Sequence, residues 1–246
     1  MKEFIKSVVG GGGNRGVLIN LPKKAFTLAE VLVTLGIIGV VAAITLPNIV
    51  VNYKKKQTVT QLKKVYSVLS QAYEMSKSEN ESSEYWIDNS VAVNTDTVKK
   101  YVQKYWLPYF KSIQECSKYG DCAYNVGATS LNGTDSLGLV GNNRYTIILG
   151  DGTLIAFVPF SWDDNLQIQY WGGSQKLYVD LNGAKKPNII GKDVFLFNVS
   201  DNKLMATCQT LSKNQIDANC SKTGGCQCCA GKIIRDNWEI KDDYPW

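Results

Sequence analysis

The sequence contains no histidine. Histidine is the commonest general base, a member of the usual catalytic triads and a ligand in most catalytic zinc sites, so its absence argues against these classes of enzyme. Carboxylates are present at Asp151, Asp163, Asp164 and Asp180, but no spacing among them selects a catalytic pair. We therefore expect no catalytic residue, no enzymatic activity and no cofactor.

Charge is missing from residues 31–53, which are rich in Val, Ile, Leu and Ala. At a rise of about 1.5 Å per residue, a helix over this run extends roughly 34 Å. That length is enough to cross a hydrocarbon core of about 30 Å. The run therefore predicts a single membrane-spanning helix close to the N-terminus.

Basic residues dominate the first 25 positions, where one acidic residue, Glu3, stands among them. These basic residues are Lys2, Lys6, Arg15, Lys23 and Lys24. Without residues 1–25, which together carry a net charge of +4, the formal net charge of +5 falls to +1, which gives no strong signal for nucleic-acid binding. Basic residues beside a span stay on the cytoplasmic side, so we expect the C-terminal part to be exported.

Cysteine is absent from the first 115 residues, which excludes a lipoprotein signal at the apolar run. All seven cysteines follow, in the part expected to be exported, where disulfides are the default. Cys116 and Cys122 enclose a small loop that favours a local disulfide. The sequence does not assign the pairing of the remaining five, which are Cys208, Cys220, Cys226, Cys228 and Cys229. A zinc site built from these five thiols is a weaker alternative, because their spacing matches no strong zinc pattern.

Glu30 is an acidic residue at the start of the apolar run. A carboxylate costs on the order of 2.5–3.5 kcal/mol at mid-membrane and less near the end of a span. A cation in the same apolar environment would compensate this cost. A new amino terminus created just upstream would supply such a cation.

The sequence AFTLAE at residues 25–30 resembles the processing and methylation motif of bacterial type IV prepilins and type II secretion pseudopilins. The resemblance implies that a prepilin peptidase cuts between Ala25 and Phe26 and methylates the new Phe26 amine. It also implies that Glu30 pairs with the terminal amine of a neighbouring subunit during assembly. The family usually has glycine at the position of Ala25. The implied partners are the peptidase, other pilin or pseudopilin subunits and the inner membrane.

The resemblance assigns Thr27, Leu28 and Pro47 to assembly together with Glu30. Pro47 lies 21 residues after Phe26, where pilins commonly carry a proline that bends the helix or loosens it in the filament. Gly36 and Gly39 let neighbouring helices approach closely, or they are simply the glycines common in membrane helices.

Two other signals compete with prepilin processing. The sequence Val41-Ala42-Ala43 resembles a signal-peptidase site, which would give a mature chain starting at Ile44. An uncleaved signal anchor is the other alternative. Neither gives Glu30 a purpose, so the prepilin interpretation is preferred.

Helical periodicity continues after the span. One face of this helix is apolar, and the rest of its surface carries lysines. The apolar positions are Val59, Leu62, Val65, Tyr66, Leu69, Ala72 and Tyr73. The helix is expected to end near Asn80. The predicted organisation is a leader at 1–25, a transmembrane and assembly helix at 26–53, an amphipathic continuation at 54–80 and an exported globular domain at 81–246.

The globular part is predicted to be a small α+β domain with disulfides. A helix is expected over 96–104, capped by Thr95 or Asp96 and followed by Pro108. Strands are expected at residues 144–149, 153–158, 177–181 and 194–199, the first two joined by an Asp-Gly turn. We expect these strands to form an antiparallel sheet on which the long helix packs. The C-terminal residues Ile233, Ile234, Trp238 and Ile240 are expected to fold back onto the domain.

Asp180, Asn182 and Asp193 lie in a segment that resembles one common in pilin-like proteins. Some pseudopilins bind calcium through such a loop, and these three oxygens are the candidate ligands here. A plain Asn-Gly turn without metal is the preferred interpretation, since the ligand set is short of the six to eight oxygens that calcium takes.

The favoured function is a structural or minor subunit of a type IV pilus or a type II secretion pseudopilus. Such a protein is a single-pass membrane protein that later becomes part of an extracytoplasmic or cell-surface filament. The alternative is a membrane-anchored binding module, for adhesion or for DNA or sugar binding, that does not polymerise. Its candidate binding residues are Trp86, Trp162, Tyr170 and Trp171.

Overall fold

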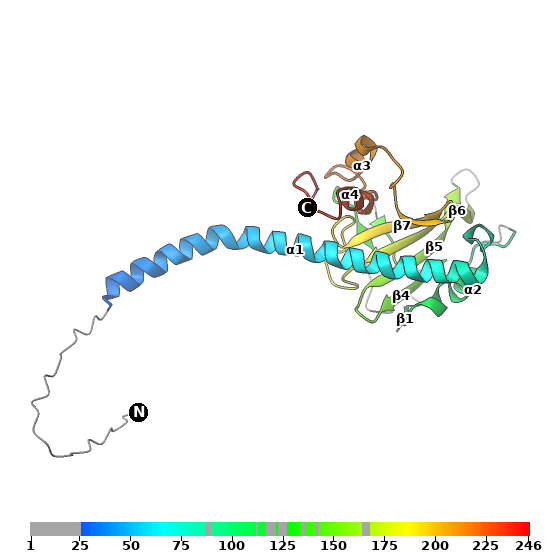
Figure 1. The fold of residues 1–246 in the computed structure, drawn as a ribbon, viewed down its shortest axis with the longest axis horizontal. Coiled ribbons are helices and arrows are strands. Elements are labelled where there is room, and N and C mark those ends of the chain that lie inside the picture. Colours follow the sequence, from blue (N-terminus) through cyan, green and yellow to red (C-terminus); the bar gives the residue numbers. More distant parts are fainter. Residues whose placement is uncertain are drawn as a thin grey trace, which may run out of the picture. The chain divides into compact units, whose positions relative to one another are not determined.

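The computed structural model of the 246-residue chain describes residues 26–86, 90–111, 113–116, 122, 127–133, 136–140, 143–163 and 168–246. Side chains at 136 and 160–174 are not described. The chain divides into two units, Met1–Ile49 and Val50–Trp246. Figure 1 shows the order of the elements along the chain.

Helix α1 (Leu28–Asn80) runs through 53 residues. Its second half is amphipathic, and every third or fourth residue from Val59 to Ser76 is buried. The helix ends at Asn80 because Glu81 takes the left-handed conformation, with φ of 63°. The predicted end of the helix is confirmed.

A six-stranded antiparallel sheet forms the centre of the Val50–Trp246 unit, with strand order β1-β4-β5-β6-β7-β8. Its strands are β1 (Ile113–Cys116), β4 (Tyr145–Leu149), β5 (Leu154–Asp163), β6 (Ile168–Asp180), β7 (Val194–Ser200) and β8 (Lys203–Ala206). A separate two-stranded sheet pairs β2 (Ala128–Thr129) with β3 (Ser136–Leu137). The predicted α+β class with an antiparallel sheet is confirmed.

The β4–β5 hairpin turns at Gly150-Asp151-Gly152 as predicted. The Asp151 Oδ1 atom accepts a hydrogen bond of 3.0 Å from the Thr153 amide, and Gly152 has a φ of +90°, which favours glycine. The predicted ends of β5 and β6 are wrong, because both strands are longer. Pro159 and a register shift between Val158 and Phe160 interrupt the alternating pattern without ending the strand.

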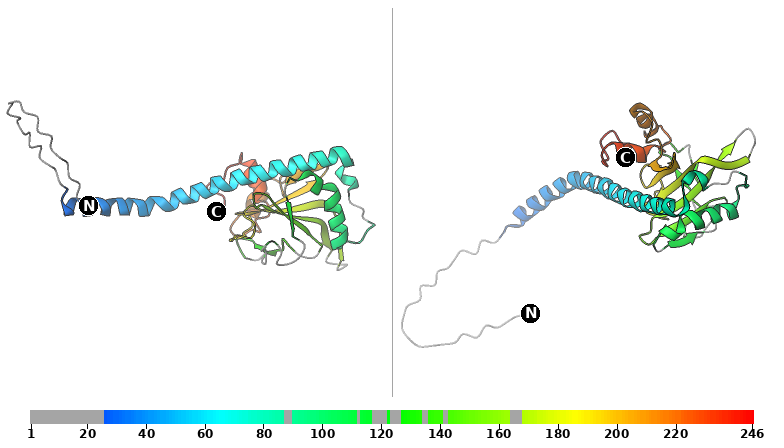
Figure 2. Two further views of the ribbon diagram at one scale, coloured as in Figure 1. Left: turned by 90° about the horizontal axis from the view of Figure 1, so that it is seen from below. Right: turned by 45° about the vertical axis from the view of Figure 1, so that its right-hand side comes forward.

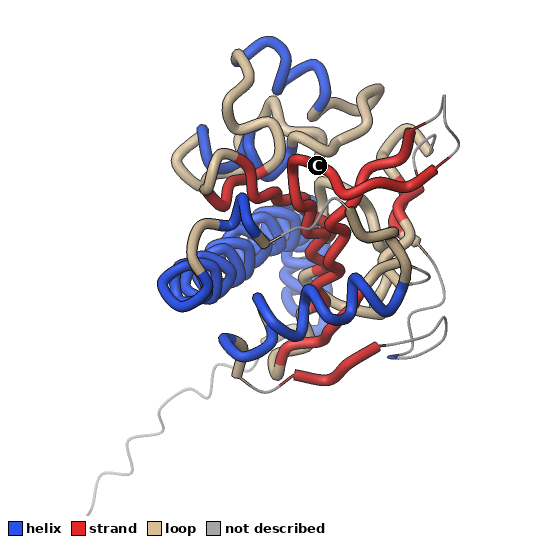
Figure 3. Tube along the Cα trace, turned by 90° about the vertical axis from the view of Figure 1, so that its right-hand side faces the viewer, coloured by secondary structure: helices blue, strands red, loops and turns tan. Residues whose placement is uncertain are grey.

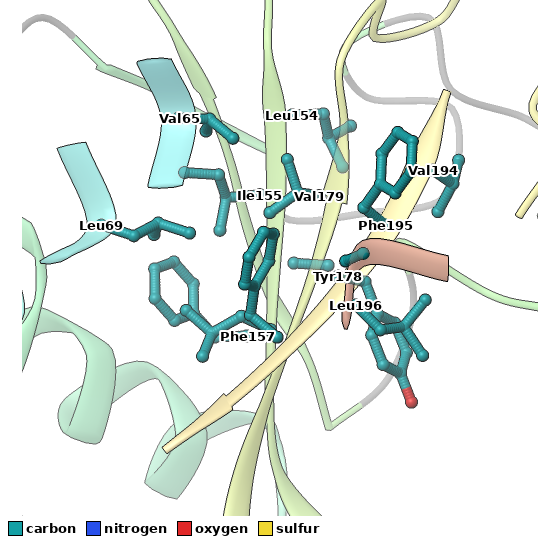
Figure 4. Close-up of a cluster of buried hydrophobic side chains, with 14 of the residues drawn as sticks. Val65, Leu69, Leu154, Ile155, Phe157, Tyr178, Val179, Val194, Phe195 and Leu196 are labelled. Carbon is teal, nitrogen blue, oxygen red and sulfur yellow. The ribbon is translucent and has the colours of Figure 1, made fainter. Parts of the chain in front are cut away.

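The second half of α1 packs on one face of this sheet (Figure 2). The ring of Tyr66 stacks on Phe197 of β7 at 5.7 Å between centroids. Val65 and Leu69 point toward Ile155 and Phe157 of β5 (Figure 4). The predicted partner of the apolar face of the long helix is therefore confirmed.

The opposite face of the sheet is covered by the segment around β2 and β3. Thr146 points away from Ile147 because successive side chains of a strand alternate, and its hydroxyl donates a 2.6 Å hydrogen bond to the carbonyl of Leu139. Ala128, Leu139 and Val140 are buried there. Helices and loops thus lie around the strands (Figure 3). The consecutive residues of β5 from Leu154 to Val158 are therefore all buried, on both faces of the sheet.

Helix α2 (Thr95–Tyr105) begins one residue earlier than predicted, and its expected caps, Thr95 and Asp96, are wrong. The N-cap is Asn94, whose side chain accepts from the Thr97 amide at 2.9 Å while the Thr97 hydroxyl accepts from the Asn94 amide at 2.9 Å. The 3-10 helix η2 (Leu107–Tyr109), which contains Pro108, follows. A further 3-10 helix, η1 (Ser83–Tyr85), follows α1.

The C-terminal segment folds back onto the domain, as predicted, through α3 (Lys213–Asn219) and α4 (Cys229–Arg235). Disulfides join Cys208 to Cys228 and Cys220 to Cys229. A third joins Cys116 to Cys122, the pair that their small loop predicts. Cys226, the seventh cysteine, is buried. The disulfides replace the thiols that the zinc alternative required.

An ion-pair network ties the C-terminal segment together. The Lys232 ammonium is buried and lies 2.7 Å from carboxylate oxygens of both Asp217 and Asp243. Asp217 also pairs with Lys213 at 2.5 Å and Arg235 at 2.8 Å. Hydrogen bonds from Lys213, Lys232 and Arg235 hold the pKa of Asp217 well below its usual range. Lys232 likewise lowers the pKa of Asp243.

The lowered pKa of Asp217 makes stability depend on pH in the acid range. Its contribution is present above the unfolded pKa of about 3.9 and is lost as the pH falls toward the folded pKa. We expect Asp217→Asn to lower the free energy of unfolding by about 1–2 kcal/mol at pH 7. The deficit should shrink below a pH of about 4, as measured by urea unfolding of the full chain in non-ionic detergent, followed by tryptophan fluorescence.

The matched control for this experiment is Asp242→Asn. Asp242 is exposed in the same segment and forms no ion pair within the described part of the chain. It should therefore change stability little at either pH. A deficit for Asp217→Asn that is equal at pH 7 and pH 3 would show that the network does not act through charge.

Candidate functional site

The start of α1 is closed by hydrogen bonds between Thr27 and Glu30. The amide and the hydroxyl of Thr27 each donate to the Glu30 Oε2 atom at 2.8 Å. The Glu30 amide donates back to the Thr27 hydroxyl oxygen at 3.2 Å. This reciprocal pattern is a capping box, which satisfies amides that have no partner within the helix. In the isolated chain Glu30 therefore stabilises the beginning of its own helix.

The residues beside this cap are exposed. Phe26 is 86% exposed and Leu28 is 77% exposed. Ala25, on the other side of the predicted cut, lies outside the described residues. Phe26, the residue on which the peptidase and methylation chemistry is expected, is thus accessible.

The apolar part of α1 is uncovered on every side. Among the described residues α1 is the one helix long and apolar enough to cross a membrane, and none of its most apolar stretch is buried. Gly36 and Gly39 face open space, because apart from the backbone of the helix itself no described atom lies within 4 Å of the position that a Cβ would take. The surface of this part of the helix is therefore available to lipid or to other helices.

Pro47 lies inside α1, and the helix continues beyond it. Proline has no amide hydrogen, so the carbonyl four residues earlier, at Ala43, receives no helical hydrogen bond from it. This is a local weakness within the apolar part. The position is the one that the pilin resemblance predicts.

Known protein families match most of the chain. Residues 48–207 match a family of unknown function, DUF6613, over well more than half of the sequence. The chain belongs to this family. In this DUF6613 member, residues 21–46 also match the prokaryotic N-terminal methylation motif. No curated protein and no solved structure matches it.

The methylation motif identifies the N-terminal part as that of a type IV prepilin-like precursor. The matched residues include the predicted cut between Ala25 and Phe26 and the capped carboxylate of Glu30. Such a motif implies processing by a prepilin peptidase and assembly with other pilins. Together with the apolar helix, it fits a single-pass membrane protein.

The three candidate calcium ligands lie together in the β6–β7 connection. Asp180 Oδ1 accepts from the Asn182 amide at 3.1 Å, and Asp193 Oδ2 accepts from the Asn182 side-chain amide at 3.0 Å. Asp193 also accepts from the amides of Asn188 and Ile189. Burial raises the pKa of the Asp193 carboxyl. Its oxygens therefore hold the turn through hydrogen bonds, and no cluster of three or more Cys, Asp or Glu residues that could bind a metal is found in the described ranges.

The aromatic residues of the binding-module hypothesis divide into two groups. Trp86 is 4% exposed and stacks on Tyr105 at 4.8 Å between ring centroids, so it is part of the core. The side chains of Trp162, Tyr170 and Trp171 lie outside the described part of the structure. Trp86 therefore offers no surface for a ligand.

The carboxylates considered for catalysis also have structural partners where they are described. Asp151 pairs with Lys64 at 2.7 Å, and Asp180 is buried in the turn described above. Asp164 and the side chain of Asp163 lie outside the described part.

The capping box of Thr27 and Glu30 is a feature that was not predicted from the sequence. Its signal was present, because Thr followed three residues later by Glu before an apolar run is the usual pattern of a capped helix start. Glu30 was interpreted through assembly alone. The structure adds a second, local partner for the same carboxylate.

Proposed function

We propose that this chain is a subunit of a type IV pilus or a type II secretion pseudopilus that acts by polymerisation rather than by catalysis. The observation that carries the proposal is the apolar part of α1, which no other described residue covers and which begins at a motif for prepilin processing. An apolar helix exposed on all sides requires lipid or other apolar helices around it.

In the proposed mechanism, the peptidase removes the basic leader and leaves a free amine on Phe26. The Glu30 carboxylate of one subunit pairs with this amine on the next and neutralises it in an apolar environment, where an isolated charge is costly. The apolar helices then bury one another in the filament. The disulfide-stapled domain is exported and faces outward.

The mature N-terminus tests this proposal. We expect intact mass spectrometry of the protein isolated from its native membrane to give a chain that begins at Phe26 with one added methyl group. A start at Ile44 would indicate signal-peptidase cleavage, and an intact Met1 would indicate a signal anchor. Either result would contradict assembly, and an intact Met1 would favour the membrane-anchored binding module.

A further inference from the structure

A cavity of about 580 Å³ lies on one flank of α1 in the Val50–Trp246 unit. The helix lines it with Lys54, Gln57, Thr58 and Gln61. The β6–β7 connection lines the other side with lysines at three positions. These are Lys185, Lys186 and Lys192, with the turn residues around them. The cavity thus gathers four ammonium groups from two segments that lie far apart in the sequence.

The positive charge of this cavity is not neutralised by its own acidic residues. Two carboxylates line it, Asp151 and Asp193. Asp151 is already paired with Lys64, and Asp193 accepts hydrogen bonds from the backbone and from Asn182. None of the four cavity lysines forms an ion pair with a described residue. The cavity is therefore suited to an anion from outside the chain, with the amides and hydroxyl of α1 as further donors.

The position of the cavity along α1 indicates where the anion comes from. Lys54 is the first charged residue after the uncharged run of residues 31–53. The residues of α1 that line the cavity end at Gln61, roughly 12 Å of helix beyond the run. At this depth the helix leaves the hydrocarbon core, and the headgroup phosphates of the leaflet on the exported side lie beside it. Trp246 also lines the cavity, and tryptophan is enriched at this interface.

We propose that this cavity, which we call the lysine cavity, binds the phosphate of an anionic phospholipid headgroup. The proposal rests on the membrane insertion of α1 but not on polymerisation. The lysines of the β6–β7 connection and Lys54 form ion pairs with the phosphate. Gln57, Thr58 and Gln61 line the same cavity and donate hydrogen bonds to it. Lipid binding here holds the unassembled domain at the membrane surface.

The test is lipid retention by the full chain, measured by native mass spectrometry from non-ionic detergent. Phosphatidylglycerol is compared with phosphatidylcholine carrying the same acyl chains. We expect preferential retention of phosphatidylglycerol, reduced about tenfold by the double substitution Lys185→Gln/Lys186→Gln. The matched control is Lys99→Gln/Lys100→Gln, a pair of consecutive exposed lysines on α2 that removes the same charge outside the cavity.

Three results would overturn the proposal. The first is equal loss of phosphatidylglycerol in the two double variants, which would reduce the effect to net charge. The second is competition by soluble glycerol phosphate at the same concentration as the lipid, which would assign the cavity to a free anion. The third is a dimer that disappears with Lys185→Gln/Lys186→Gln, which would assign it to an acidic surface of a second copy.

This experiment is independent of the outcome for filament assembly. Retention is measured on the unassembled chain, so a protein that never polymerises still gives the predicted lipid preference. Thermal unfolding midpoints of the two double variants should equal that of the unsubstituted chain, because the four substituted side chains are exposed.

Discussion

Replacing Glu30 by glutamine is expected to remove the chain from sheared filaments while cleavage before Phe26 continues. Glutamine at this position can still accept the hydrogen bonds that the Thr27 amide and hydroxyl donate to Glu30. It cannot neutralise the amine of a neighbouring Phe26. We therefore expect incorporation to fall at least tenfold, on the order of 1.4 kcal/mol or more of assembly free energy.

Because Glu30 also takes part in the capping box, Glu30→Ala alone cannot separate the role of its charge from its role in the cap. Glu30→Ala removes both the cap and the charge, whereas Glu30→Gln removes the charge and keeps the cap. Thr27→Ala weakens the cap and keeps the charge, so we expect its loss of incorporation to be smaller than that of either Glu30 variant. Quantitative mass spectrometry of the sheared fraction from cells carrying each variant at the native locus gives the comparison.

The relative incorporation of these variants into filaments decides between the two roles of Glu30, assembly and helix capping. Normal incorporation of Glu30→Gln alongside loss of Glu30→Ala would assign the carboxylate to helix capping only. Cleavage must be verified for each variant from the mature mass, since an unprocessed chain cannot assemble for a different reason.

The largest loss of stability is expected from Phe157→Ala, at about 3–5 kcal/mol. Phe157 is 1% exposed in the centre of β5. Its ring lies 5.3 Å from that of Trp106 and 6.3 Å from that of Phe110, between centroids. It also lies under the second half of α1, near Leu69 (Figure 4). Alanine would leave a cavity where two helical segments and the sheet meet.

Two further substitutions define the scale of this effect. Phe157→Leu keeps most of the buried volume and should cost about 1 kcal/mol. Gln71→Ala changes an exposed position of α1 and should lie within about 0.5 kcal/mol of the unsubstituted chain. Urea unfolding in non-ionic detergent, followed by tryptophan fluorescence, measures all three. A cost below about 1 kcal/mol for Phe157→Ala would mean that the sheet and helices do not share one core.

The helical part of the fold could be predicted closely because its signals are local. The uncharged run, the spacing of the apolar residues from Val59 to Tyr73 and the polar residues after Met75 define α1 without reference to the rest of the chain. Local turn chemistry also predicted the β4–β5 hairpin and the Cys116–Cys122 disulfide. Local signals were misleading at α2, where Thr97 rather than Glu or Gln completes the box with Asn94.

The packing of the long helix on the sheet was predicted, but other features that depend on distant residues were not. The pairing of Cys208 with Cys228 and of Cys220 with Cys229 depends on where α3 and α4 lie. The short edge strands β1 and β8 form because neighbouring strands supply their hydrogen bonds. The lysine cavity is lined by both Lys54 and Lys185, which lie more than one hundred residues apart in the sequence. No pattern within either segment indicates this proximity.

The packing of α1 on the sheet also governs when the domain can fold. The Tyr73 hydroxyl donates to Asn202 at 3.0 Å across 129 residues of sequence. Tyr66 stacks on Phe197 of β7, which lies similarly far along the chain. Contacts of such sequence separation form slowly, because the loop between them must first be closed. The helix leaves the ribosome long before β7 does. The apolar face of its second half therefore stays exposed on the nascent chain, where it can aggregate, until translation is nearly complete.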